Sequence, residues 1–65
     1  MSKNKAQECF DLVKEFFKDD SRKAIDWFHE LNSSLGGIRP IEMIHNGRSD
    51  KLLKFILSRL DGNFP

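Results

Sequence analysis

Residues 32–47 read Asn-Ser-Ser-Leu-Gly-Gly-Ile-Arg-Pro-Ile-Glu-Met-Ile-His-Asn-Gly, and the rest of the chain is organised around this stretch. The pair Gly36-Gly37 ends the helix before it, because glycine reaches positive φ without steric cost. Pro40 suits the first turn of a new helix, where its missing N–H is no loss. The Asn46-Gly47 pair then ends that helix. We therefore expect a short helix over 40–46 between two turns.

On both sides of this stretch, apolar residues recur at offsets of three, four and seven, which is typical of amphipathic helices. They predict helices over roughly 4–18, 21–32 and 50–61, with Asp20 or Ser21 capping the second and Ser49 capping the fourth. The side chains expected to face the core are Ala6, Cys9, Phe10, Val13, Phe16, Phe17, Ala24, Ile25, Phe28, Leu31, Ile41, Met43, Ile44, Leu52, Leu53, Ile56 and Leu60, with Trp27 beside them. The predicted fold is all-α, a compact bundle of about four short helices that forms one domain over 1–65.

Length and composition exclude several classes of protein. A chain of 65 residues with one cysteine has no disulfide framework, and its longest apolar run, Phe55–Leu57, is far too short to span a membrane. The formal charge of +1 argues against nucleic-acid binding. We therefore expect a cytoplasmic protein with a protein partner. A domain of this size hides only about 60% of its unfolded surface, so a second copy of the chain is an alternative partner.

Residues that often carry chemistry are few. Cys9 lies on an apolar stripe and is interpreted as a small buried hydrophobe. His29 and His45 have no ligand-type partner at helical spacing, which predicts no metal site. We expect no cofactor and no enzymatic activity. A basic strip at the start of the last helix is interpreted as a solvated face or a contact for an acidic partner; its residues are Arg48, Lys51 and Lys54.

Residues 24–65 carry a pattern of four elements in a fixed order. The pattern consists of Trp27-Phe28, Leu35-Gly36-Gly37-x-x-Pro40 followed by Met43-Ile44, then Gly47, and a last helix ending in Leu57-x-x-Leu60-x-Gly62. In this order and spacing it resembles the toxin-binding domain of Xre/MbcA/ParS-type antitoxins. Such antitoxins usually carry a DNA-binding helix-turn-helix domain as well, for which this chain has no room. We therefore expect the toxin-binding module alone, either as a stand-alone protein or as a fragment of a longer one.

The resemblance implies a function. Members of that family neutralise a partner toxin, commonly a RES-domain enzyme that consumes NAD, and place their C-terminal end against its active-site cleft. Carried over by position, the expected contact end is Arg59, Asp61, Gly62, Asn63, Phe64 and Pro65. Phe64 either anchors that interface or folds back on the core. The alternative is a helical interaction module, or a phage- or plasmid-encoded regulator, with another protein target.

Overall fold

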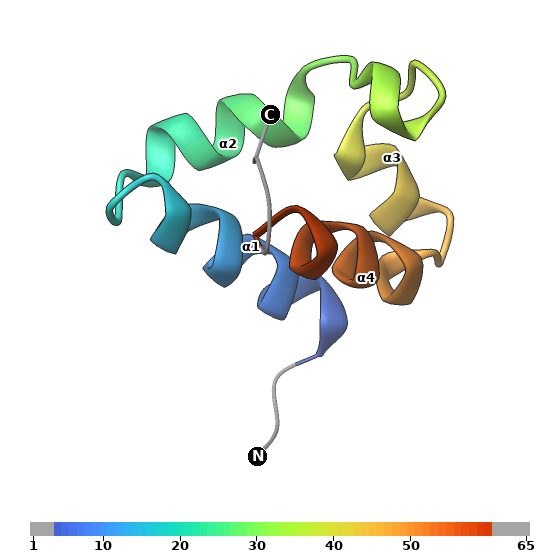
Figure 1. Cartoon of the computed structure of the whole chain (residues 1–65). Helices are drawn as coiled ribbons and strands as arrows, with labels where there is room; N and C mark the ends of the chain where they lie inside the picture. The colour runs from blue at the N-terminus through green and yellow to red at the C-terminus, as the bar shows by residue number, and fades with distance from the viewer. Residues whose placement is uncertain (1–3, 61–65) are drawn as a thin grey trace.

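The computed structural model describes residues 4–60; residues 1–3 and 61–65 lie outside the description. The described part forms four α-helices and one 3₁₀ turn, and it contains no strand (Figure 1). The all-α prediction is therefore confirmed. The elements are α1 (Lys5–Phe16), α2 (Ser21–His29), η1 (Ser33–Leu35), α3 (Pro40–His45) and α4 (Ser49–Leu60).

Helix α1 is shorter at its C-terminal end than the predicted 4–18. Its N-cap is Asn4, whose side chain accepts a hydrogen bond from the backbone N–H of Gln7 (2.8 Å). The helix ends at Phe16 because the chain then turns into the left-handed region at Lys18 (φ 57°) and Asp19 (φ 66°). The N–H of Lys18 donates to the carbonyl of Glu15 and that of Asp19 to the carbonyl of Lys14. This pair of bonds is a Schellman motif.

Helix α2 also ends earlier than the predicted 21–32. Asp20 is its N-cap and accepts a hydrogen bond from the N–H of Lys23 (3.2 Å), which agrees with one of the two caps expected. After His29 the chain becomes extended, and the N–H of Asn32 donates to the carbonyl of Ile38 (2.9 Å). This pairing closes the loop that contains η1. The backbone N–H of Asn32 is therefore bonded within the loop and does not continue α2.

Helices α3 and α4 are joined by a tight turn at Gly47. The N–H of Gly47 donates to the carbonyl of Ile44 and that of Arg48 to the carbonyl of Met43, which forms a second Schellman motif. The predicted role of Gly47 as a stop is thus confirmed, with α3 ending at His45. Helix α4 begins at Ser49, one residue before the predicted start, so Ser49 lies in the first turn and not before it.

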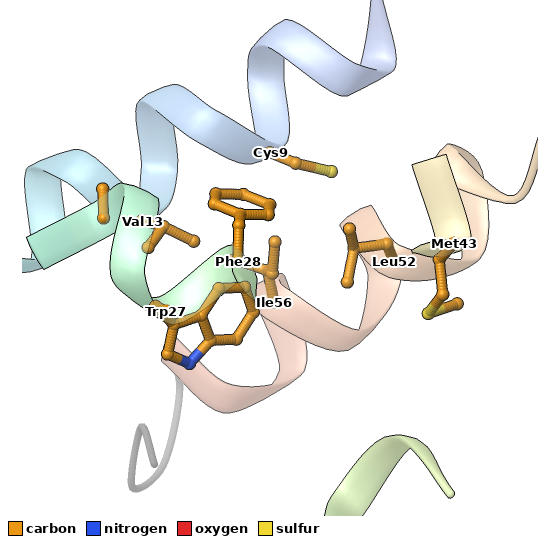
Figure 2. Close-up of a cluster of buried hydrophobic side chains, with 8 residues drawn as sticks. Cys9, Val13, Trp27, Phe28, Met43, Leu52 and Ile56 are labelled. Carbon is orange, nitrogen blue, oxygen red and sulfur yellow. The ribbon is translucent and has the colours of Figure 1, made fainter. Parts of the chain in front are cut away.

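The core joins all four α-helices (Figure 2). Phe28 of α2 lies between the buried side chains of α1 and those of α4, and its ring stacks against Phe10 at 6.0 Å between centroids. Trp27 packs edge-on to Phe28 at 5.0 Å and is only 7% exposed, so it belongs to the core and does not merely flank it. The buried hydrophobic residues are Cys9, Val13, Ala24, Trp27, Phe28, Met43, Leu52 and Ile56.

Four residues expected to face the core are instead exposed. Leu31 lies beyond the end of α2 and is 64% exposed, because the early end of that helix removes it from the helical face. The other three lie at the edge of the apolar face of their helix, beyond the part of that face that packs against another helix. They are Phe16, Ile25 and Leu60. Burial in so small a bundle reaches only the centre of each stripe.

Candidate protein-binding site

The end of α4 is the described part of the predicted contact end. Arg59 lies there, in the last turn of the helix. Its guanidinium donates to the hydroxyl of Ser34 (3.0 Å) and lies over the ring of Phe55, 5.1 Å from the ring centroid. Ser34 belongs to η1, so this bond joins the end of α4 to the loop between α2 and α3. The other predicted contact residues lie outside the described residues; they are Asp61, Gly62, Asn63, Phe64 and Pro65.

The Leu35-Gly36-Gly37 turn lies directly after Ser34. Gly36 (φ 83°) and Gly37 (φ 80°) are both left-handed, as expected of a turn that only glycine adopts easily. The side chain of Asn32 accepts from the N–H of Ser34 (2.9 Å), and the carbonyl of Asn32 accepts from the N–H of Gly37 (3.0 Å). The turn is therefore held by hydrogen bonds to the side chain and the carbonyl of Asn32, and it follows directly after Ser34, the hydrogen-bond partner of Arg59.

Arg39 joins the end of α2 to the start of α3. Its side-chain Nε donates to the carbonyl of His29 (3.0 Å), while its backbone N–H donates to the carboxylate of Glu42 (2.9 Å). Pro40 follows as the first residue of α3 and is buried. These contacts join the end of α2 to the first turn of α3.

The pattern residues of the resemblance separate into two groups. Trp27, Phe28 and Pro40 are buried, so their role in this chain is to hold the fold. Leu35 is partly buried against the core, and Gly36 and Gly37 are exposed in the turn. Sequence reasoning missed Ser34, because its partner Arg59 lies 25 residues away and no local pattern connects them.

Cys9 is buried, as the sequence predicted. Its Sγ lies 3.7 Å from the carbonyl oxygen of Ser49, at the start of α4. Burial raises the pKa of the Cys9 thiol from its ordinary 9.0 to about 11, and the negative charge of Glu8 adds to the shift. The thiol is therefore neutral at physiological pH, which is the opposite of what an activated nucleophile requires.

The histidines and the basic strip lie on the surface. The Nδ1 of His29 is 2.8 Å from the carbonyl oxygen of Ile25, one turn earlier in α2. Within residues 4–60, no group of three or more His, Cys, Asp or Glu side chains is placed to hold a metal ion. The strip residues Arg48, Lys51 and Lys54 are all exposed, in agreement with a solvated face.

An apolar groove between α1, α2 and α3 was not expected, because its residues were assigned to the core. It has a volume of about 340 Å³, and its apolar lining includes Phe10, Ile25, Ile41 and Ile44. The sequence contains more apolar residues at core-facing positions than a small bundle can bury. This excess is the signal that could have indicated an apolar groove on the surface.

No helix among the described residues has the length and apolar character needed to cross a membrane. No protein-family model matches the chain, and neither a curated protein nor a solved structure does. The likeness to antitoxins therefore depends on the residues of the sequence pattern alone.

Proposed function

We propose that this chain is a non-enzymatic, antitoxin-like protein that binds a partner toxin through the C-terminal end of α4 and blocks its active-site cleft. The observation that carries the proposal is the bond between Arg59 and Ser34. It joins the end of the last helix to the residue before the Leu35-Gly36-Gly37 turn, and that turn belongs to the most specific part of the sequence pattern. A binding surface formed by the turn and by the end of α4 together would explain why the sequence pattern contains both.

The surroundings of Arg59 suit a contact residue. Its guanidinium is held on two sides, by the hydroxyl of Ser34 and by the ring of Phe55. A side chain that is already ordered loses less conformational entropy when a partner binds. Arginine also carries five N–H donors, so donors beyond the one facing Ser34 can reach carboxylate or carbonyl groups of the toxin.

The proposed target class, a RES-type enzyme that consumes NAD, comes from the resemblance. In this mechanism the chain supplies no catalytic group. It acts by occupying the cleft through which NAD would enter, with the residues after Leu60 as the inserted part.

The test uses a purified RES-domain toxin, with NAD consumption as the readout. We expect the intact chain to stop the consumption of NAD. Deleting Asn63–Pro65, or making Arg59→Glu, should weaken inhibition by tenfold or more while the far-UV circular dichroism spectrum stays helical. Lys51→Glu makes the same charge change at an exposed site elsewhere on α4 and serves as the control. Unchanged inhibition by the deletion variant would refute the contact end.

A second candidate function is an interaction module with another protein target. The apolar groove lined by Phe10, Ile25, Ile41 and Ile44 favours it, because that surface lies on α1, α2 and α3 and not at the end of α4. An Ile25→Gln variant separates the two functions. It should leave toxin inhibition intact under the first proposal, and it should abolish partner binding under the second.

A further inference from the structure

A third surface depression lies between α1 and α4, apart from the end of α4 and from the groove of α1, α2 and α3. It has a volume of about 330 Å³. Its lining, among the described residues, consists of three leucines and three carboxylates: Leu12, Leu53, Leu57, Glu8, Asp11 and Glu15. We call it the α1–α4 groove.

The apolar side chains of the lining, which we call the floor of the α1–α4 groove, come from both helices. Leu12 comes from α1, and Leu53 and Leu57 come from successive turns of α4. Leu57 is 47% exposed, and Leu60, one turn further along α4, is also exposed. Side chains at spacings of four and three lie on one face of a helix, so these leucines form a strip that leads from the groove toward the end of α4. Such a strip is a typical floor for the apolar face of another helix.

The acidic side chains of the lining, which we call the rim of the α1–α4 groove, all come from α1. Glu8, Asp11 and Glu15 lie at spacings of three and four along α1, which places them on the same side of that helix. Glu8 and Glu15 are seven residues apart, or about 10 Å along a helix that rises about 1.5 Å per residue. No lysine or arginine is among the described residues that line the groove. The basic side chains of α4, Lys51 and Lys54, are exposed but do not line it.

We propose that the α1–α4 groove binds a basic amphipathic helix of another protein. The apolar side chains of that helix pack on Leu12, Leu53 and Leu57, and its Lys or Arg side chains face the carboxylates of α1. Two turns of such a helix match the distance between Glu8 and Glu15, since residues at i, i+3 or i+4, and i+7 share one face.

A second copy of this chain fits the groove poorly. In a symmetric dimer the same patch meets itself, so two linings that each carry three carboxylates and no lysine or arginine among the described residues would be brought together. Like charges at an interface weaken association and select against that partner. The charge of the rim therefore favours a basic partner over self-association. This inference does not depend on the proposed toxin-binding function.

The test uses three synthetic helical peptides of 14 residues that share one leucine face and carry Lys, Gln or Glu beside it. Each is titrated into the full ¹⁵N-labelled chain and followed by amide chemical shifts at low and at physiological salt. The matched variants are Glu8→Gln/Glu15→Gln and, as a control with the same change of charge in α2 and at its C-cap, Asp26→Asn/Glu30→Gln. A Leu57→Ala variant tests the floor of the groove.

We expect the Lys peptide to bind most tightly, with its largest shifts at Glu8–Glu15 and Leu53–Leu57. The Glu8→Gln/Glu15→Gln variant should weaken it by about 3- to 20-fold at low salt and less at higher salt, the range for two partly exposed ion pairs. Leu57→Ala should weaken it by about tenfold, for the loss of apolar contact. The control should bind as the parent does. Equal weakening by the control, shifts centred elsewhere, tightest binding of the Glu peptide, or a dimer of the chain that buries this groove would each overturn the proposal.

Discussion

The turn after α1 contains a lysine where helix ends of this kind favour glycine. Lys18 adopts φ 57° as the left-handed residue of its Schellman motif, and Gly47 adopts φ 74° at the equivalent position after α3. The two turns have the same pair of backbone hydrogen bonds, with lysine at the left-handed position of the first and glycine at that of the second. The first turn also has a further left-handed residue, Asp19. Replacing Lys18 by glycine should therefore stabilise the protein, and replacing Gly47 by alanine should destabilise it.

The expected magnitudes follow from the backbone alone. A residue with a side chain loses about 1–2 kcal/mol in the left-handed region, whereas glycine loses about 0.5–1 kcal/mol of extra chain entropy on folding. Lys18 is exposed, so its side chain contributes little burial. Lys18→Gly should raise the free energy of unfolding by about 0.5–1 kcal/mol, and Gly47→Ala should lower it by about the same amount. A Cβ at Gly47 would have no heavy atom within 4 Å apart from those of Gly47 and its chain neighbours. The destabilisation by Gly47→Ala is therefore conformational and not steric.

Urea and thermal unfolding, followed by circular dichroism at 222 nm and by the fluorescence of the buried Trp27, measure both changes. In a domain of this size 1 kcal/mol corresponds to about 4–8 °C in Tm, so Lys18→Gly should raise Tm by about 2–8 °C. Lys18→Ala is the control, since it removes the same side chain and keeps a Cβ. If Lys18→Ala stabilised as much as Lys18→Gly, or if Lys18→Gly lowered Tm, the backbone argument would be refuted.

Three further predictions concern the caps, the core and the thiol. Asp20→Ala should lower the free energy of unfolding by about 1 kcal/mol, because the N–H of Lys23 loses its acceptor; Asp26→Ala is the control in urea unfolding. Phe28→Ala should cost about 3–5 kcal/mol and leave little cooperative unfolding, while Phe28→Leu should cost less. The pKa of the Cys9 thiol is about 11 in the folded chain, against an ordinary 9.0. Its contribution to the free energy of unfolding should therefore be complete below pH 9 and be lost between pH 9 and 11, because the unfolded chain releases the proton first. A Cys9→Ala variant should lack this loss.

The helices were predictable from the sequence wherever a local signal marks their ends. Pro40 starts α3, Gly47 ends it, and Asp20 caps α2 through bonds to residues only a few positions away. The end of α2 was not predictable in the same way. It depends on the pairing of Asn32 with Ile38, which a helical pattern of apolar residues does not reveal.

The candidate contact end was predictable only in part. Arg59 was nominated from the resemblance, but its bond to Ser34 and its position over Phe55 depend on the packing of α4 beside the loop after α2. The α1–α4 groove was not predicted at all. Its carboxylates and Leu12 lie on α1, whereas Leu53 and Leu57 lie on α4, at least 38 positions later in the sequence. Each helix looked like an ordinary amphipathic helix when considered alone.

Periodicity, glycine and proline positions were enough to establish an all-α chain and the approximate limits of its helices, because these signals act over one or two helical turns. The packing of four helices then selected which apolar side chains are buried. Trp27 entered the core while Ile25, two residues earlier, stayed on the surface. A bundle this small can cover only the centre of each apolar stripe, and the remaining apolar side chains form the surfaces through which we expect the protein to act.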